Sequence, residues 1–351
     1  MKALIKKEAA EGLWMAEVPR PTIGDRDVLI RIRQAAICGT DVHIWKWDEW
    51  AAQTVPVGLT VGHEYVGVVE ACGREVTHLK VGDRAGVGTM VGSCGECEYC
   101  KAGRQNVCLK GNVQTYNGRH YDGRPTFGGY SSSIAVDENF ALRIPENLSL
   151  DAAAPLLCAG ITVYAPLKRW AAGPGKRVAI MGMGGLGHLG VKFAAAFGAE
   201  TYVLGTSPAK AADAASFGAT GYILVNDEAT FEKYHNFFDI VLNTTSSNIA
   251  VDKILGLLRV GGSLVNVGLP PADEHFNPFS LIASMKSISG SNTGGIAETQ
   301  AMLDFCAEHS IAAEVEIVDA TEASAIDRAY DRMLHSDVRY RFVIDMASLK
   351  G

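Results

Sequence analysis

The stretch from Arg177 to His188 constrains the fold more than any other part of the chain. An apolar run, RVAIM, is followed by three glycines with G-x-G-x-x-G spacing: Gly182, Gly184 and Gly187. From Leu186 to Phe197, apolar residues recur every three or four positions, which predicts a helix. The order is therefore strand, glycine turn and helix.

This order suits the pyrophosphate of a dinucleotide. The first glycine permits a tight turn, the second lets backbone approach the phosphates, and the third lets helix pack closely on strand. The helix N-terminus then offers N–H groups to the anion. The expected cofactor-binding positions here are Gly182, Gly184, Gly185, Leu186 and Gly187. A turn that binds nothing is the alternative, because the chain has 38 glycines.

The end of the second expected strand, 201–206, bears on the choice of cofactor. An NAD-specific fold usually carries Asp or Glu there to bind the ribose 2′-hydroxyl. This chain has no carboxylate at that point, and it offers Thr206, Ser207 and Lys210 instead. Hydroxyls and an ammonium suit a 2′-phosphate. Ser207 also fits as a helix cap before Pro208. We expect NADP(H) to be preferred, with NAD(H) as the second choice.

Strand and helix patterns alternate through the second half of the chain. The expected strands are 177–182, 201–206, 221–225, 238–243, 263–267 and 287–291. Such alternation predicts a doubly wound parallel sheet, an α/β fold whose ligands bind at the carboxyl ends of the strands. At the ends of the fifth and sixth strands we expect the nicotinamide carboxamide to meet backbone near Val267, Gly268, Ser289 and Ser291.

The first 150 residues have a different texture. Short strand patterns, such as 2–6, 27–36, 61–71 and 83–87, are separated by frequent Gly and Pro, which is typical of a barrel-like β domain. A helix at 297–309 and a strand at 340–345 are expected to rejoin it. The expected domains are thus 1–152 with 293–351, and a nucleotide-binding domain at 153–292.

Charge and composition exclude several classes of partner. The net charge is −7 and no basic stripe is present, so nucleic acid is not an expected partner. No apolar run reaches about 18 residues, so no membrane span is expected. The N-terminal apolar segment is too short for a signal peptide. We therefore expect a cytoplasmic protein, in which eight cysteines favour metal binding or catalysis over disulfides.

Four cysteines lie within fifteen residues in the pattern C-x2-C-x2-C-x7-C: Cys94, Cys97, Cys100 and Cys108. Four thiolates this close can surround one tetrahedral zinc ion and leave no site for water, which indicates a structural role. An iron–sulfur cluster also takes four cysteines, but no second cluster motif accompanies it. Free thiols or disulfides are the third interpretation.

A second possible metal set is more scattered. Cys38, Thr40 and His43 follow the strand 27–36, His63 and Glu64 come about 25 residues later, and Cys158 lies near the expected domain boundary. Spacing alone does not join these residues. A lone cysteine or histidine is commonly a packed core residue.

The motifs together resemble the zinc-dependent medium-chain dehydrogenase/reductase superfamily over the whole chain. Residues 1–84, with CGTDVH and GHEYVG, resemble L-threonine 3-dehydrogenases. Residues 85–351, with GGY, APLLCAGI, GMGGLG and VRYRFVID, resemble the cinnamyl alcohol dehydrogenase and aldehyde reductase family. A chimeric or designed sequence would show such a division.

The resemblance implies a GroES-like β-barrel catalytic domain joined to a Rossmann nucleotide domain. It implies two zinc ions per chain, a structural ion in the four-cysteine cluster and a catalytic ion bound by Cys38, His63 and Cys158. Glu64 would stand behind the catalytic ion. Thr40 and His43 would relay the proton that leaves the substrate. Subunits in this superfamily form dimers and tetramers, often through an edge strand of the nucleotide domain, so a homodimer or homotetramer is expected.

Three functions remain open at this point. An NADP(H)-dependent alcohol dehydrogenase that reduces aldehydes is favoured, because no fixed partner for a zwitterion can be named and Cys158 stands where threonine dehydrogenases carry an acid. L-Threonine 3-dehydrogenase with NAD is the alternative, and a nucleotide-binding relative without turnover is the third. Three tryptophans after the first zinc motif either line an aromatic-friendly pocket or pack in the core: Trp45, Trp47 and Trp50.

Overall fold

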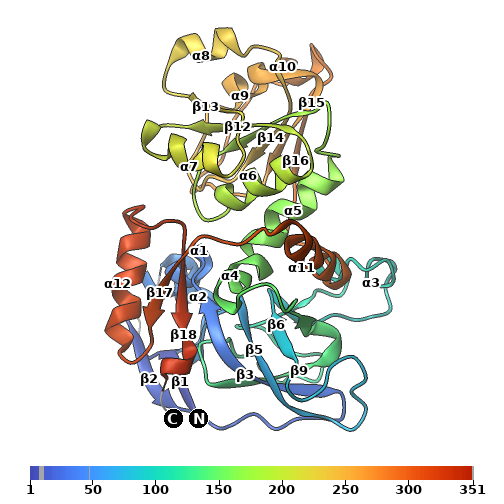
Figure 1. Ribbon diagram of the computed structural model, residues 1–351, viewed down its shortest axis with the longest axis vertical. Coiled ribbons are helices and arrows are strands. Elements are labelled where there is room, and N and C mark those ends of the chain that lie inside the picture. Colours follow the sequence, from blue (N-terminus) through green and yellow to red (C-terminus); the bar gives the residue numbers. More distant parts are fainter. Residues whose placement is uncertain (8–11, 47, 350–351) are drawn as a thin grey trace. The chain divides into compact units, whose positions relative to one another are not determined.

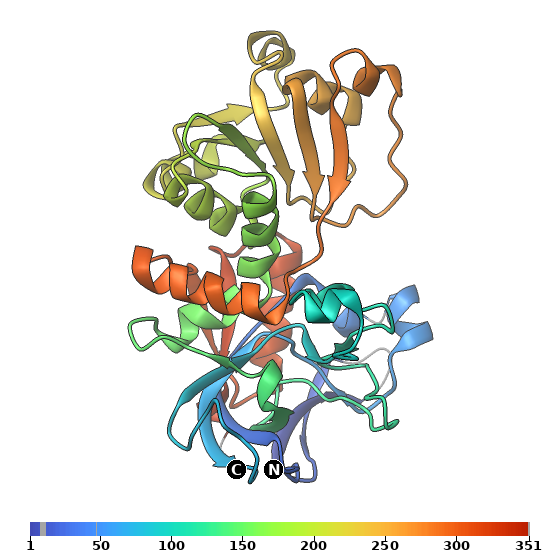
Figure 2. The same cartoon turned by 90° about the vertical axis from the view of Figure 1, so that its right-hand side faces the viewer.

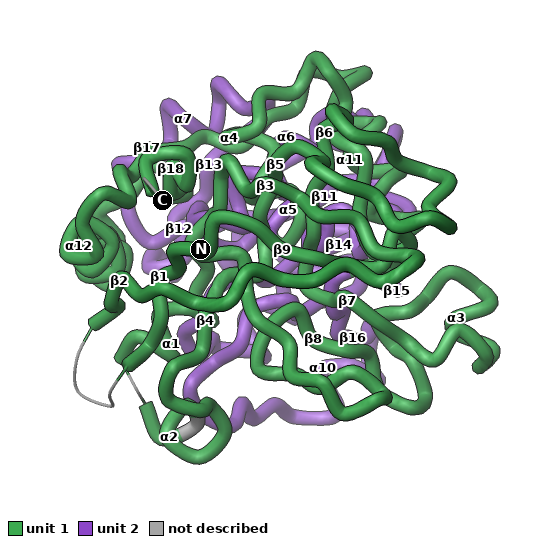
Figure 3. Tube along the Cα trace, turned by 90° about the horizontal axis from the view of Figure 1, so that it is seen from below, with its two compact units in different colours: residues 1–158, 294–351 green, residues 159–293 purple. Residues whose placement is uncertain are grey.

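A computed structural model describes residues 1–7, 12–46 and 48–349. The chain forms two compact units, which Figure 3 colours separately. Unit 1 comprises Met1–Cys158 and Gly294–Gly351, and unit 2 comprises Ala159–Thr293. The expected boundary after residue 152 and the observed division after Cys158 differ by a short segment that packs on strands of unit 1.

Unit 1 is built mainly from β-sheet (Figure 1). Its largest sheet has the order β10-β6-β5-β3-β18-β17, and β9 also pairs with β3. A three-stranded sheet has the order β2-β1-β4, and β7 pairs with β8. The strands are β1 (Lys2–Lys6), β2 (Leu13–Glu17), β3 (Asp27–Ala36), β4 (Leu59–Thr60), β5 (Tyr65–Cys72), β6 (Arg84–Val87), β7 (Met90–Gly92), β8 (Val113–Gln114), β9 (Ser133–Asp137), β10 (Leu142–Arg143), β17 (Val315–Asp319) and β18 (Arg341–Asp345).

Short helices join these strands. They are α1 (Gly39–Lys46), α2 (Glu49–Thr54), α3 (Glu98–Lys101), α4 (Leu150–Ala153), α11 (Ile296–His309) and α12 (Ala323–Leu334). Single 3-10 turns are η1 (Gln105–Val107), η2 (Glu138–Phe140), η3 (Ala154–Leu157) and η5 (Met346–Ser348). The core contains alternate residues of β3, such as Val28, Ile30 and Ile32, because successive strand side chains point to opposite faces.

The C-terminal segment completes the large sheet of unit 1. Strand β18 pairs antiparallel with β3 and parallel with β17. Helix α12, which the sequence analysis did not assign, buries Ile326, Ala329 and Tyr330 on one side. These three residues have helical spacing, so the face they share packs into the core of unit 1.

Unit 2 is a six-stranded sheet in which every neighbouring pair is parallel. Its order is β13-β12-β11-β14-β15-β16, the classic order of a dinucleotide-binding domain. The strands are β11 (Arg177–Met181), β12 (Glu200–Gly205), β13 (Gly221–Leu224), β14 (Phe238–Asn243), β15 (Leu258–Asn266) and β16 (Ser287–Gly290). All six lie where the sequence pattern predicts strands.

Helices cover both faces of this sheet (Figures 1 and 2). They are α5 (Ala159–Arg169), α6 (Gly187–Ala196), α7 (Ala211–Ser216), α8 (Glu228–Lys233), α9 (Val251–Leu257) and α10 (Phe279–Ile282), with the turn η4 (Pro208–Lys210). Helix α6 packs on β11 and β12, and Gly190 lets it approach Ile180 closely. On the other face, α9 packs among Ala179, Met181 and Val241.

The Ala- and Leu-rich segment 152–167, expected to be one helix, is three pieces. Helix α4 ends at Ala153, and the turn η3 follows with Pro155 as its second residue. Cys158 then has backbone angles outside the helical region, with φ of −126° and ψ of −70°. Proline has no N–H to continue the α-helical ladder, so the helix breaks there. Among the described residues, no single helix is long and apolar enough to cross a membrane. Only the bent pair Leu150–Leu157 and Ala159–Arg169 passes on length and composition.

Candidate active site and metal centres

The pairing of β3 with β5 brings two distant parts of the sequence together. The strands run antiparallel, with Ala35 opposite Tyr65, and the N–H of Ala36 donates to the carbonyl of Glu64 at 2.8 Å. Cys38 follows the end of β3, and His63 precedes the start of β5. The register of one ladder therefore places these two side chains side by side, although 25 residues separate them.

Cys158 reaches the same place from the break between η3 and α5. Its Sγ lies 3.9 Å from Sγ of Cys38 and 3.3 Å from Nε2 of His63. Turn η3 packs on β3, β5, β6 and β18, which fixes this approach. One ligand atom from each of Cys38, His63, Glu64 and Cys158 lies within 4.8 Å of the others.

This donor set fits zinc. Zn–S bonds of about 2.3 Å at a tetrahedral angle separate two thiolates by about 3.8 Å, close to the distance between Cys38 and Cys158. Glu64 is fully buried, and among the described residues its Oε2 has no hydrogen-bond partner. Its Oε1 contacts the guanidinium of Arg341, which is also buried. A buried carboxylate oxygen without a partner is costly unless a ligand completes the site.

The electrostatics of the group also suit a cation. The hydrogen bond with Cys158 lowers the pKa of Cys38 well below its ordinary value and raises that of Cys158. Burial alone lowers the pKa of His63, but the negative charges of Asp41 and Cys38 outweigh it and raise this pKa. Burial raises the pKa of Glu64 to about 8, against the attraction of Arg341. Cys38 is thus favoured as thiolate, the form that binds metal.

Asp41 supports this site and was missed from the sequence. Its side chain is fully buried, and Oδ1 lies 3.6 Å from Nδ1 of His63. Its Oδ2 accepts the N–H of Cys38 at 2.9 Å and the hydroxyl of Tyr130 at 3.3 Å. The hydroxyl of Tyr116 donates to Oδ1 at 3.1 Å. Metal-bound histidines usually have such a carboxylate on their other nitrogen. A carboxylate within the Cys38–His43 motif was the available signal.

Thr40 and His43 lie on α1 and are exposed. A spacing of three residues places them on one side of the helix. Nδ1 of His43 lies 2.5 Å from Oδ2 of Asp48, whose Oδ1 also caps α2 by accepting the N–H of Ala51. Asp48 is therefore a second carboxylate that sequence reasoning missed. It holds the His43 ring in one orientation.

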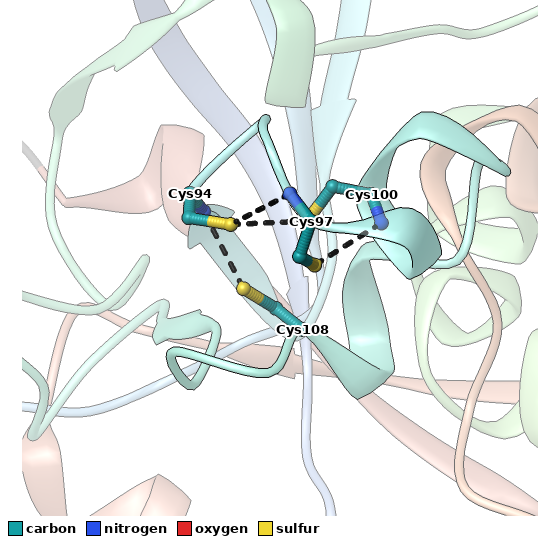
Figure 4. A group of neighbouring side chains, drawn as sticks. All are labelled: Cys94, Cys97, Cys100 and Cys108. Carbon is teal, nitrogen blue, oxygen red and sulfur yellow. Dashed lines mark hydrogen bonds between the residues drawn. The ribbon is translucent and has the colours of Figure 1, made fainter.

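The four clustered cysteines also converge (Figure 4). Sγ of Cys94 lies 3.8 Å from Sγ of Cys100, again close to the separation of two thiolates on one zinc. Backbone N–H groups point at the sulfurs, from Cys97 to Cys94, from Cys100 to Cys97 and from Cys94 to Cys108. N–H bonds from Leu109 and Cys100 lower the pKa of Cys97 to about 6. Such donors stabilise thiolates, so this lobe fits a closed, structural zinc site.

The glycine turn of unit 2 has the geometry that a pyrophosphate needs. Gly182 has φ of +90°, which favours glycine, and a Cβ on Gly187 would lie 2.0 Å from the carbonyl oxygen of Gly182. A Cβ on Gly184 would meet nothing within 4 Å, so space is open over that residue. Gly185 and Leu186 complete the turn, and the side chain of Leu186, the N-cap residue of α6, makes no capping hydrogen bond. These features fit a bound dinucleotide.

The other predicted cofactor positions lie at the carboxyl ends of the strands. Thr206 and Ser207 are exposed after β12, and Ser207 accepts the N–H of Ala209 as a cap. The N–H groups of Val267 and Gly268 donate to the carbonyl of Asn243, beyond the end of β15. Ser289 lies in β16, and Ser291 follows it and donates to Asn266.

Packing also places Trp45, left open by the sequence, and His188. The rings of Trp45 and Tyr330 lie 5.5 Å apart in a tilted arrangement, and the indole N–H of Trp45 donates to Asp327 at 2.7 Å. Trp45 is thus partly buried and packs against the core of unit 1. Trp47 and the side chain of Trp50 lie outside the described residues. His188 is fully buried and faces Phe217, so it does not face solvent.

Comparison with known families decides the class. Residues 24–146 match the alcohol dehydrogenase GroES-like domain, and residues 185–308 match the zinc-binding dehydrogenase family. The chain belongs to the zinc-dependent alcohol dehydrogenase family. This medium-chain dehydrogenase/reductase combines a GroES-like domain with a Rossmann domain. Its members are oxidoreductases that act on CH–OH groups, and this chain is one of them.

The similarity to individual alcohol dehydrogenases runs through the whole chain. The chain is 51% identical over 332 residues to probable formaldehyde dehydrogenase AdhA of Bacillus subtilis, covering 95% of this chain and 93% of that protein. It is 50% identical over 352 residues to NADP-dependent alcohol dehydrogenase C 1 of Mycolicibacterium smegmatis, covering 100% and 99%. Among solved structures, a cinnamyl alcohol dehydrogenase of Sorghum bicolor matches with a TM-score of 0.93, 38% identity and coverage of 99% and 98%.

Proposed function

We propose that this protein is an NADP(H)-dependent alcohol dehydrogenase that works mainly as an aldehyde reductase. The observation that carries the proposal is the convergence of Cys38, His63 and Cys158 in one buried group beside Glu64. Three protein ligands leave the fourth tetrahedral position open to a substrate oxygen, which is the pattern of a catalytic zinc site. The four-cysteine lobe binds a second, structural zinc.

The residues of the chain divide the work between them. A zinc ion held there supplies Lewis acidity toward an alcohol or carbonyl oxygen. The nicotinamide supplies the hydride chemistry. Thr40 exchanges the substrate proton, and His43, whose ring Asp48 orients, passes that proton to solvent. Thr40 and His43 can do this because both side chains are exposed. Asp41, whose Oδ1 lies 3.6 Å from Nδ1 of His63, keeps Nε2 of the ring directed at the ligand group.

NADP(H) is the preferred cofactor. No carboxylate follows β12 to bind a ribose 2′-hydroxyl, and the exposed hydroxyls of Thr206 and Ser207 suit a 2′-phosphate. The Mycolicibacterium relative named as NADP-dependent points the same way.

An aromatic or medium-chain aldehyde is the proposed substrate class, as the name of the Sorghum structure suggests. L-Threonine with NAD is the alternative. It needs fixed partners for an ammonium and a carboxylate, and Cys158 stands at the position where an acidic residue would argue for it.

Paired initial rates on one zinc-loaded sample test the proposal. One reaction contains NADPH and cinnamaldehyde, and the other contains NAD and L-threonine. We expect fast aldehyde reduction and little threonine oxidation, with about two zinc ions per chain by elemental analysis. Fast threonine oxidation with NAD would contradict both the substrate class and the cofactor choice. One zinc without turnover would indicate a binding protein.

A second copy of the chain is the proposed partner. Strand β16 is an edge of its sheet, since among the described residues it pairs only with β15. Large apolar side chains are exposed in the neighbouring strand β15 and in the segment between β15 and β16, namely Val260, Leu269, Phe276, Phe279, Ile282 and Met285. An exposed edge strand accompanied by exposed apolar side chains favours pairing with another chain. We place the homodimer, or each dimer of a homotetramer, at this edge. None of the chain's eight cysteines, all of which lie in the described residues, forms a disulfide, which suits the cytoplasm.

A further inference from the structure

The glycine turn of unit 2 is braced through its carbonyl groups. The hydroxyl of Thr244 donates to the carbonyl of Met181 at 2.9 Å and lies 3.4 Å from that of Gly182. Nζ of Lys210 donates to the carbonyl of Met183 at 2.9 Å. The backbone N–H of His188 donates to the carbonyl of Gly184 at 3.1 Å. Four consecutive carbonyls are thus held by three residues.

This bracing fixes the direction of the N–H groups in the turn. In a trans peptide, the N–H of one residue points opposite to the carbonyl of the residue before it. The contact of Lys210 with Met183 therefore orients the N–H of Gly184, the residue over which space is open. Nδ1 of His188, 3.3 Å from the carbonyl of Gly184, acts similarly on Gly185. Oriented backbone N–H groups are what a pyrophosphate binds.

Lys210 comes from a different segment than the turn it braces. Lys210 is the last residue of η4, and η4 directly follows Thr206 and Ser207, the residues proposed to bind the 2′-phosphate. That segment is itself held in place, because the hydroxyl of Tyr222 donates to the carbonyl of Ser207 at 2.8 Å and Asn226 donates to that of Thr206 at 3.2 Å. The side chain of Lys210 links this segment to the glycine turn.

We propose that Lys210 is a positioning residue for the pyrophosphate as well as a charge for the 2′-phosphate. It joins the segment that selects the cofactor to the turn that holds every dinucleotide. The inference rests on the proposed cofactor site and deepens it. It predicts that losing Lys210 weakens the binding of both NADPH and NADH, whereas losing the Ser207 hydroxyl weakens NADPH alone.

The experiment compares four variants of the full-length, zinc-loaded protein. Lys210→Met keeps side-chain length and removes the donor, and Lys210→Arg restores a donor. Ser207→Ala removes only the hydroxyl, and Lys233→Met is the matched control, because Lys233 is an exposed lysine on α8 of the same unit. Fluorescence titration gives Kd for NADPH and NADH. Amide hydrogen exchange without nucleotide reports on residues 182–190.

We expect Lys210→Met to raise both Kd values, that for NADH by about tenfold, as for a lost charge-assisted hydrogen bond. Exchange in 182–190 should become faster in the same variant. Lys210→Arg should recover NADH affinity, Ser207→Ala should weaken NADPH alone, and Lys233→Met should change nothing.

Two results would overturn the inference. One is a Lys210→Met protein that loses NADPH affinity but keeps wild-type NADH affinity and exchange, which would make Lys210 a phosphate contact only. The other is unchanged binding of both nucleotides. A wild-type protein that prefers NADH would contradict the proposed cofactor instead, and the brace would still be tested by NADH binding and exchange.

Discussion

Asp41 and His63 form a buried pair in which Oδ1 of the carboxylate lies 3.6 Å from Nδ1 of the ring. The opposite nitrogen, Nε2, lies 3.3 Å from Sγ of Cys158. One side of the histidine therefore faces the ligand group, and the other faces a carboxylate that also accepts the N–H of Cys38. A single residue thus supports two of the three proposed zinc ligands.

Asp41→Asn should weaken the proposed catalytic zinc site by about 10- to 100-fold, the usual effect of losing such a supporting carboxylate. The amide has the same shape but no negative charge to orient the ring. Zinc retained against a competing chelator is the measurement. Asp48→Asn, which changes an aspartate outside the ligand group, is the control and should keep its zinc. Wild-type retention in Asp41→Asn would refute this role.

Thr40→Val should lower turnover by about 100-fold or more while both zinc ions remain, because general acid–base steps contribute about that much. Asp48→Asn should lower turnover less, since it removes only the partner of His43. Steady-state rates at saturating aldehyde and NADPH test both. Glu49→Gln is the control, because Glu49 is a neighbouring carboxylate that accepts a hydrogen bond from the side chain of Gln53. If the Thr40→Val variant turned over as fast as wild type, Thr40 would not be part of the proton path.

Ile282→Glu should dissociate the proposed dimer. Ile282 is 70% exposed at the end of α10, which precedes the edge strand β16 in the chain, and a buried charge without a partner is costly at an interface. Sedimentation velocity measures the mass in solution. Val81→Glu is the control, because Val81 is 62% exposed in unit 1. Equal masses for wild type and Ile282→Glu would place the contact elsewhere or show a monomer.

Glu138 should make folding stability depend on pH in the acid range. It is buried, which raises its pKa, but the N–H groups of His78 and Thr77 donate to it at 2.8 Å and lower the pKa overall below its ordinary 4.5. The unfolded state then takes up the proton first. The stabilisation that ionised Glu138 gives to the folded protein is therefore present above about pH 4.5, and it is lost as the pH falls through the lower pKa that Glu138 has in the folded state.

Thermal melts of wild type and Glu138→Gln from pH 3 to 7 measure this effect. At pH 7 the variant should have a lower melting temperature, because its free energy of unfolding should fall by about 1–3 kcal/mol, as when hydrogen bonds to a charged group are lost. The difference should shrink toward pH 3, where the wild-type carboxyl is also neutral. A constant difference across the range would mean that ionisation of Glu138 does not contribute.

The sequence predicted unit 2 well because its signals are local. Each strand of the parallel sheet is a short apolar run, and the glycine spacing marks the turn before α6 within a few residues. The four-cysteine cluster could be predicted for the same reason, since Cys94 and Cys108 are close in sequence and a short loop brings them together.

The buried ligand group could not be assembled in the same way. Cys38, His63 and Cys158 are joined by the β3–β5 register and by the break at Pro155, and neither leaves a local pattern. Asp48 was likewise missed, because a carboxylate five residues from a histidine is a common arrangement on any surface. Family resemblance supplied the ligand triad, whereas packing alone revealed the supporting carboxylates.

The sequence by itself determined the fold class, the dinucleotide turn and the clustered cysteines, because helical and strand periodicity, glycine conformation and short loops act between near neighbours in the chain. Tertiary structure alone decided that Trp45 packs against the core, that Asp41 supports His63 and that Lys210 braces Met183. Those contacts join segments whose distance in space is set by strand pairing and packing, which no local pattern records.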